Sequence, residues 1–336
     1  MRRYLIILMM PCFVMLFGIC CLAGCEGSRH HLKKVRLNEV AHSIFYAPQY
    51  VAIEKGYFEK EGIKLELTTG FGADKTATAV ISGDADIAFM GPEATIYQFN
   101  QGNADYLINF AQLTQRAGNF VVSREKEDSF KWEDLKGKKV AVTSLGSANY
   151  FQLQAAMESA GLTIDDVQVE IVGTGAILTA LTEGQVDAIV FSKLRTIELN
   201  NSGYAASEIT CDQFLPSFGN VLVAGDKLVA EDPETVDGFC RALNKAIEYI
   251  IDGHVEEAVD MSIEKYAPTF AEKRDVVVQI LNDVFVKTLW QSDYTKENGI
   301  GASNPEKWQA LIDESKEIGN IDETFDASEL LYTPAK

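Results

Sequence analysis

Cysteine is scarce in this sequence, with six in 336 residues. Four of them lie near the start, Cys12, Cys20, Cys21 and Cys25. Only Cys211 and Cys240 follow, which excludes a disulfide framework, and the chain has no CxxC pair with metal-ligand spacing. These two cysteines can pair in an oxidising compartment. We expect two separate buried thiols instead, because free cysteine is commonly buried.

Basic residues are also few relative to acidic ones, with 30 Lys and Arg against 49 Asp and Glu and a formal net charge of −19. An acidic body repels nucleic acid and anionic lipid headgroups, so neither is an expected partner. The one long apolar run, residues 4–19, is shorter than the ~20 residues that span a bilayer. The rest of the chain has no expected membrane span, and its length suits two domains better than one.

The first residues have the features of an export signal. Arg2 and Arg3 precede the apolar run, and a Leu-Ala-Gly-Cys sequence that ends at Cys25 follows it. This sequence resembles the lipobox of bacterial lipoproteins, which implies cleavage before Cys25 and a diacylglyceryl group on its sulfur. We expect a signal peptide over residues 1–24, a polar tether over 25–34, and an extracytoplasmic body that lipid holds at the cell membrane. The alternative is a plain transmembrane anchor.

From residue 35 onwards, predicted strands and helices alternate, and the same plan occurs twice. Residues 180–187 match residues 79–86 at an offset of 101, and Gly219 matches Gly118 at the same offset. Short connections between alternating strands and helices indicate parallel sheets that are covered on both faces. We therefore predict an α/β fold of two doubly wound lobes with one topology.

Two apolar segments, residues 120–123 and 221–224, are expected to cross between the lobes. If they pair as neighbouring strands, they form a two-strand hinge. The predicted boundaries are residues 35–122 and 221–336 for lobe one and residues 123–220 for lobe two.

Four motifs, in this order, resemble one protein family. They are residues 42–48 (HSIFYAP), 54–62 (EKGYFEKEG), 135–140 (LKGKKV) and 184–188 (GQVDA). Behind a lipobox, they are similar to the substrate-binding proteins of ABC importers, in the branch for nitrate, sulfonates, taurine and thiamine precursors. The resemblance implies a type II periplasmic-binding-protein fold that closes on a small solute and delivers it to a membrane permease with its ATPase. We expect a monomer without cofactor or metal.

In doubly wound lobes, ligands bind beyond the carboxyl ends of the strands, at helix N-termini. The loops at those places supply the candidate ligand-binding residues, which are His42, Phe45, Tyr46, Phe71, Asp74, Gly91, Pro92, Glu93, Gln115, Arg116, Ser144, Gly146, Ser147, Asn149, Tyr150, Thr174 and Phe191. The aromatic residues among them suit a flat, partly apolar solute. Trp290 lies in the C-terminal helices, where core packing is its expected role.

Glu93 favours a nitrogen-containing solute, because a carboxylate in the cleft accepts hydrogen bonds from an amine or a ring amino group and repels a sulfonate. A first-turn carboxylate also stabilises its helix, which is the structural alternative. Gly146 and Ser147 lie where a loop meets a helix, a place that suits an anion or a carbonyl oxygen, although Ser147 can simply cap that helix. The sulfonate-binding members tend to carry His at the position of Asn149.

An aminopyrimidine or a similar planar nitrogen-containing vitamin precursor is therefore the expected solute class. A sulfonate, taurine or nitrate is the alternative, and either Arg116 or Arg195 facing the cleft would favour it.

Catalytic motifs are missing. Residues 70–76 lack the Gly before Lys that a phosphate loop needs, and residues 173–178 lack the third Gly of a dinucleotide fingerprint. The chain has no GxSxG elbow and no metal-spaced ligand cluster. We expect a binding protein and not an enzyme. A ligand-sensing module for a receptor and a secreted enzyme on the same fold remain alternatives.

Overall fold

A computed structural model describes residues 32–102, 106–116, 118–126, 129–192, 197, 199, 202–204, 206–211, 219 and 221–335. The expected signal peptide, Cys25 and most of the tether lie outside the described residues, and so does Arg195. By its internal contacts, Lys34–Lys336 forms one compact unit.

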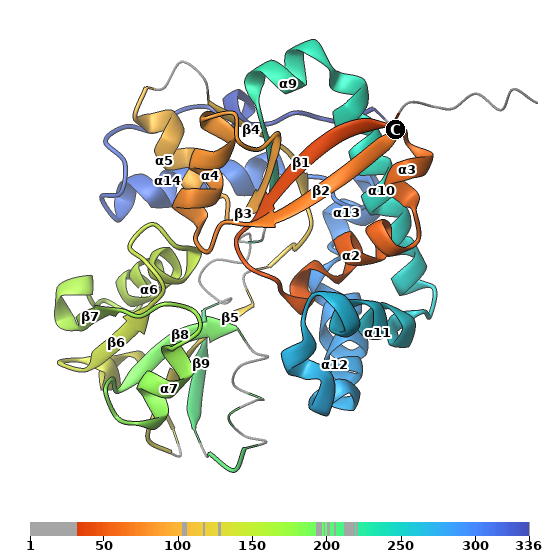
Figure 1. Cartoon of the computed structure of the whole chain (residues 1–336). Helices are drawn as coiled ribbons and strands as arrows, with labels where there is room; N and C mark the ends of the chain where they lie inside the picture. The colour runs from red at the N-terminus through yellow and green to blue at the C-terminus, as the bar shows by residue number, and fades with distance from the viewer. Residues whose placement is uncertain are drawn as a thin grey trace, which may run out of the picture. The chain divides into compact units, whose positions relative to one another are not determined.

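Ten described strands form two separate five-stranded sheets (Figure 1). The first has the order β2-β1-β3-β10-β4 and consists of β1 Lys33–Glu39, β2 Ile63–Thr69, β3 Ile87–Met90, β4 Leu107–Gln112 and β10 Val221–Gly225. The second has the order β7-β6-β8-β5-β9 and consists of β5 Asn119–Ser123, β6 Lys139–Val142, β7 Gln168–Ile171, β8 Ala188–Ser192 and β9 Ser207–Thr210. The two orders match strand for strand, as a duplicated topology requires. We call each sheet with its covering helices a lobe.

The two segments expected to form a paired hinge lie in different sheets, which corrects that expectation. β10 pairs antiparallel with β3 and β4, and β5 pairs antiparallel with β8 and β9. Each strand is largely buried and second from one edge of its sheet, so both of its sides are already hydrogen-bonded within that sheet. The first crossing therefore falls before Asn119, and residues 119–122, which we had assigned to lobe one, belong to the second sheet.

One acidic residue has the same structural role in both halves of the repeat. Asp86 accepts a hydrogen bond from the Arg36 backbone N–H at 2.8 Å, and Asp187 accepts one from the Lys139 backbone N–H at 3.0 Å. Asp86 directly precedes β3 and ties it to β1, and Asp187 directly precedes β8 and ties it to β6. The matching residues 79–86 and 180–187 thus reflect a shared way of joining two parallel strands.

The strands of the first sheet alternate between two apolar layers, as the period of two for side chains requires. Ile87 and Phe89 pack into one cluster, and Ala88 and Met90 pack into the other. The helices that cover this lobe are α2 Ala47–Glu54, α3 Tyr57–Lys60, α4 Ala73–Ile81, α5 Glu93–Asn100, α9 Asp226–Glu231, α10 Pro233–Ile251, α11 Val255–Lys265, α12 Arg274–Ile280, the π-helix η5 Leu281–Leu289, α13 Asp293–Asn298 and α14 Pro305–Glu317. Short 3₁₀ turns add η1 Ile44–Tyr46, η4 Pro268–Lys273 and η6 Ala327–Leu330.

The second lobe is smaller. Its helices are α6 Ala148–Ser159 and α7 Ile177–Thr182, with the 3₁₀ turns η2 Trp132–Leu135 and η3 Ile164–Asp166. α6 also reaches the first lobe, because its fully buried Phe151 packs into the same cluster as Met90. Separation of the lobes would expose this ring to water.

The chain passes between the sheets twice, from β4 to β5 and from β9 to β10, and Thr114 of the first passage touches Gly219 of the second. A Cβ placed on Gly219 would lie 2.5 Å from the carbonyl carbon of Thr114. Glycine is required at this position because any side chain would overlap the backbone of the other passage.

Candidate functional site

A cavity of about 230 Å³ lies between the two lobes. Its wall comes from segments that follow β1, β2 and β3 of the first sheet and β6 and β7 of the second, and from the end of β8. Asn119 at the start of β5, Gly219 before β10 and Phe270 of η4 complete the described wall. The cavity therefore lies at the carboxyl ends of the parallel strands, where the fold class places a ligand.

Eleven of the candidate residues line the cavity. They are His42, Phe45, Tyr46, Phe71, Gly91, Glu93, Ser144, Ser147, Asn149, Thr174 and Phe191. Wall residues that the sequence analysis did not single out include Ala41, Thr143, Gln152, Ser192 and Phe270.

Six candidates lie off the described wall, which corrects the expectation that they face the cleft. They are Asp74, Pro92, Gln115, Arg116, Gly146 and Tyr150. The carboxyl group of Asp74 lies against Gly146, where a Cβ would come within 2.8 Å of Asp74 Cγ, so this pair forms a contact between the lobes. Arg116 is exposed, and its like charge adds to the effect of burial in lowering the pKa of Lys307.

The remaining three are used by the scaffold. Pro92 precedes α5 as its N-cap residue, and Tyr150 packs against the apolar core of the second lobe. Gln115 donates to the Gln112 carbonyl at 2.8 Å and accepts a hydrogen bond from Ser292 at 3.2 Å. Polar side chains that follow strands therefore stabilise the segments between the lobes as well as lining the cavity.

Glu93 is the first residue of α5 and is fully buried. The backbone N–H groups of Glu93 and of Ala148, at the start of α6, lower its pKa, but neither carboxyl oxygen has a hydrogen-bond partner of good geometry among the described residues. Burial is the stronger effect and, with the nearby charge of Asp74, raises the pKa of Glu93 to about 8. At neutral pH the group is thus mostly a protonated acid, able to donate one hydrogen bond and accept others.

Gly91 makes room for that acid. The Glu93 side chain folds back over it, and a Cβ at position 91 would lie 2.6 Å from Glu93 Cδ. In the Gly-Pro-Glu sequence, Glu93 therefore begins α5, and Gly91 leaves the space that the Glu93 carboxyl group occupies.

Glu39, at the end of β1, is a buried residue that the sequence analysis missed. Its carboxylate accepts hydrogen bonds from Gln49 at 2.7 Å, from the Tyr50 hydroxyl at 3.1 Å, and from His42 through Nδ1. This hydrogen bond raises the pKa of His42. The alternation of β1 could have revealed it, because Glu39 follows Val35 and Leu37 at the next buried position of the strand.

The start of α6 faces the cavity from the second lobe. Ser147 caps the helix by accepting from the Tyr150 N–H at 3.3 Å, and its hydroxyl donates to the Ser144 carbonyl at 2.7 Å. Asn149 donates to the Val190 carbonyl at 2.6 Å, which ties α6 to β8. Gln152 lies one turn further along the same face, and its Oε1 is buried without a partner among the described residues.

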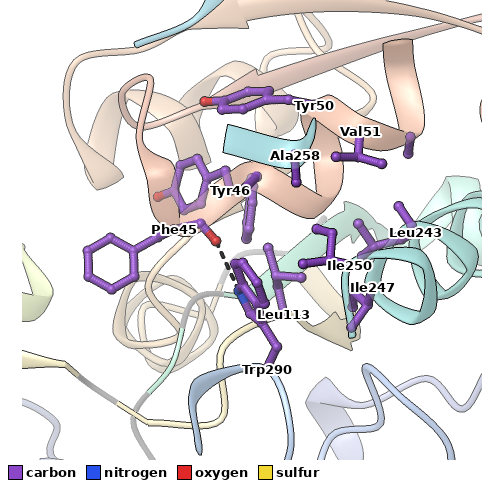
Figure 2. Packing of buried hydrophobic residues seen from close by; sticks show 14 of the residues in the cluster. Phe45, Tyr46, Tyr50, Val51, Leu113, Leu243, Ile247, Ile250, Ala258 and Trp290 are labelled. Atoms are coloured by element: carbon purple, nitrogen blue, oxygen red, sulfur yellow. Dashed lines mark hydrogen bonds between the residues drawn. The ribbon is translucent and has the colours of Figure 1, made fainter. Parts of the chain in front are cut away.

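Aromatic rings form much of the wall. Phe45 stacks on Phe285 with ring centroids 4.8 Å apart, and Tyr46 packs on Phe89 at 4.0 Å. The Phe45 carbonyl accepts a hydrogen bond from Trp290 Nε1 at 3.3 Å, and Figure 2 shows the Phe45 ring pointing away from that contact. Phe71 is 79 % exposed and has a φ of 58°, an unfavourable conformation for a bulky residue.

Charge at the site is limited. Among the described residues of the wall, the side chains that titrate are His42, Tyr46 and Glu93, and none is Lys or Arg. The described residues hold no cluster of three or more His, Cys, Asp or Glu with the geometry of a metal site. Cys211 and Cys240 are buried and are not joined in a disulfide, as expected. No helix within the described ranges has the length and apolar character to cross a membrane.

Three sequence relatives illustrate what the chain is similar to. It is 48% identical to "Putative binding protein YtlA" of Bacillus subtilis over 127 residues, which are 38% of each chain. It is 23% identical to "Riboflavin-binding protein RibY" of Chloroflexus aurantiacus over 268 residues, 79% of this chain and 75% of that protein. It is 26% identical to "4-amino-5-hydroxymethyl-2-methylpyrimidine phosphate synthase" of Aspergillus parasiticus over 237 residues, 65% of this chain and 67% of that protein.

Solved structures support the fold class. The alkanesulfonate-binding protein SsuA of Xanthomonas axonopodis pv. citri, bound to MOPS, matches with a TM-score of 0.72 at 14% identity, over 89% of this chain and 98% of that one. A Candida albicans protein with the generic periplasmic-binding-protein fold matches with a TM-score of 0.68 at 17% identity, over 91% and 98%. The predicted fold class is thereby confirmed. The model of the family described as NMT1/THI5 like matches residues 44–258, and the chain belongs to that family.

Proposed function

We propose that this chain is the solute-binding protein of an ABC importer, anchored by lipid on Cys25 outside the cell membrane, and that it captures an aminopyrimidine or a similar planar nitrogen-containing solute. Glu93 is the observation that carries the proposal. It is a fully buried acid whose carboxyl oxygens have no hydrogen-bond partner of good geometry among the described residues, at the wall of a cavity between two lobes. Leaving such a group unpaired costs about 1–3 kcal/mol. A solute that supplies the missing partners recovers this energy when it binds.

The chemistry of Glu93 favours a solute with an amino group beside a ring nitrogen. A protonated carboxyl group donates to the ring nitrogen and accepts from the amino group, so one planar edge satisfies both of its oxygens. The pKa of about 8 keeps this form dominant at neutral pH. The buried Oε1 of Gln152 is a further acceptor from the opposite lobe. The cavity therefore provides both kinds of hydrogen-bonding group that an aminopyrimidine edge needs.

The volume and the aromatic wall support a small flat solute. About 230 Å³ is below the ~300–1,000 Å³ typical of drug-sized ligand pockets, which favours one ring over the three rings of a flavin. Phe45, Tyr46 and Phe191 offer apolar ring faces. The relatives named for a pyrimidine and for riboflavin are consistent with a nitrogen heterocycle.

An organosulfonate, taurine or nitrate is the second candidate. The N-terminus of α6 at Ser147 favours an oxyanion, and SsuA shares the fold. Against it, the described wall has no Lys or Arg to neutralise the charge. We therefore rank it second.

A thermal-shift screen tests the solute class. The panel contains 4-amino-5-hydroxymethyl-2-methylpyrimidine, riboflavin, taurine, MOPS and nitrate. We expect the aminopyrimidine to raise the melting temperature by several degrees, because a ligand at 100 times its Kd adds about 2.7 kcal/mol to stability. Mass spectrometry should recover the bound compound unchanged, as for a binding protein. Stabilisation by the anions alone would overturn the solute class, and chemical conversion of the pyrimidine would overturn the binding role.

A further inference from the structure

His42 is held by its surroundings and still faces the cavity. Its Nδ1 is hydrogen-bonded to Glu39, and the edges of Tyr50 and Tyr266 pack on its ring with centroids 6.2 and 5.8 Å away. Its side chain is nevertheless 42 % exposed and lies in the cavity wall. Among the described residues no group is hydrogen-bonded to Nε2. The ring is therefore oriented by the protein, and its free nitrogen is available to a solute.

Among the described residues, the hydrogen-bond partners of the Glu39 carboxylate are His42 and two other side chains close to it. It is fully buried, and its hydrogen bonds come from His42, Gln49 and Tyr50, with no Lys or Arg among them. A buried carboxylate is costly unless charge and hydrogen bonds compensate it. An imidazolium at His42 supplies the opposite charge, and a histidine that is charged donates from both nitrogens.

We propose that the Glu39–His42 pair is a second recognition pole of the cavity, where His42 Nε2 donates a hydrogen bond to an oxygen acceptor of the solute. Glu39 is then a positioning residue that keeps the ring oriented and charged. This inference rests on the proposed function and adds to it. The solute carries its amino edge toward Glu93 and an oxygen toward His42.

Glu39 of one pole and Glu93 of the other both act electrostatically on Tyr46. Burial raises the pKa of Tyr46, and the charges of Glu39 and Glu93 raise it further. His42, Tyr46 and Glu93 line the same cavity, so one solute there can contact both poles.

The pH dependence follows from the groups around His42. Glu39 of β1 raises the pKa of His42, and the Tyr50 and Tyr266 hydroxyls are uncharged at neutral pH because burial raises their pKa values. Glu54 accepts from the Tyr266 hydroxyl at 2.9 Å and is paired with Lys265, which balances its charge. His42 therefore keeps its proton to a higher pH than an ordinary histidine. Solute affinity should fall as the pH rises through the pKa of His42.

Two probes that differ in one oxygen test the proposal by titration calorimetry. These are 4-amino-5-hydroxymethyl-2-methylpyrimidine and 4-amino-2,5-dimethylpyrimidine. The wild-type protein should prefer the hydroxymethyl compound by about 10- to 100-fold, the range for a hydrogen bond to a charged group. His42→Phe, which keeps an aromatic ring against the stacked pair of Tyr50 and Tyr266, should lose most of this preference. His254→Phe is the matched control, because His254 also stacks on a tyrosine, at 3.9 Å from Tyr249, and lies outside the described wall.

A pH series separates positioning by Glu39 from a purely structural role. In a Glu93→Gln background, so that Glu93 does not titrate, Glu39→Gln should move the midpoint of the affinity-against-pH curve to lower pH, and the ring NMR signals of His42 should titrate with it. An unchanged midpoint, or an unchanged preference in His42→Phe, overturns this inference and leaves the proposed function intact. Failure of the wild-type protein to bind either probe overturns both.

Discussion

Glu93→Ala is expected to weaken the binding of 4-amino-5-hydroxymethyl-2-methylpyrimidine by about 30- to 150-fold. The substitution removes a donor and an acceptor that meet the amino edge of the solute, and two such hydrogen bonds contribute about 2–3 kcal/mol. Titration calorimetry at pH 7 measures the change directly. Glu329→Ala is the matched control, because Glu329 is an exposed acid in η6 away from the described wall, and its loss should leave affinity unchanged.

Glu93→Gln should behave differently from Glu93→Ala. The amide donates and accepts in the same plane as a protonated carboxyl group, so we expect less than about a tenfold loss at pH 7. In the wild-type protein, affinity should fall as the pH rises through about 8, because burial raises the pKa of Glu93 to that value and the ionised form cannot donate. Glu93→Gln should lack this part of the pH dependence. Equal or tighter binding by Glu93→Ala would point to an anionic solute instead.

Trp290→Ala is expected to have the largest effect on stability, a loss of about 3–5 kcal/mol from the free energy of unfolding. Trp290 is fully buried in the main cluster of the first lobe, in edge contact with Phe285 and hydrogen-bonded to the Phe45 carbonyl (Figure 2). Its removal leaves a large cavity and an unpaired carbonyl. Because Phe45 lines the site, the folded protein should also bind its solute less tightly. Urea unfolding measures the loss of stability. Titration calorimetry at low temperature, where the variant is folded, measures the loss of affinity.

Trp308→Ala is the matched control for that experiment. Trp308, in α14, is almost fully buried but belongs to the other cluster of the first lobe and lies outside the described wall. We expect a comparable loss of stability without a change in solute affinity. If both variants weaken binding equally, the lower affinity of Trp290→Ala does not come from the lost contact with Phe45.

Much of the fold could be predicted because local pattern and global topology agree. The repeat at an offset of 101 reflects real constraints, such as the aspartates that join β1 to β3 and β6 to β8. The return of residues 221–225 to the first lobe was predicted, but the entry of β5 into the second sheet, without pairing to β10, was not. An apolar strand that is buried on both faces has the same sequence pattern whichever sheet it enters, and only the order of the completed sheets decides its neighbours.

The candidate site was predictable to a similar degree. Loops after strands could be identified, so most of the cavity wall was anticipated, but the direction of each side chain within a loop could not. Asp74 and Glu93 both begin helices near the cleft, yet one contacts Gly146 across the lobes and the other lines the cavity. Glu39 and Gln152 were missed because each is a single polar residue at a buried position, next to apolar residues that suit core packing.

A crystal structure of the protein with the stabilising compound of the screen tests the central claim most directly. We predict one planar ring in the cavity between the lobes, with its amino edge hydrogen-bonded to Glu93 and an oxygen within hydrogen-bonding distance of His42 Nε2. A ligand bound outside this cavity, or inside it with Glu93 still unpaired, would contradict the account.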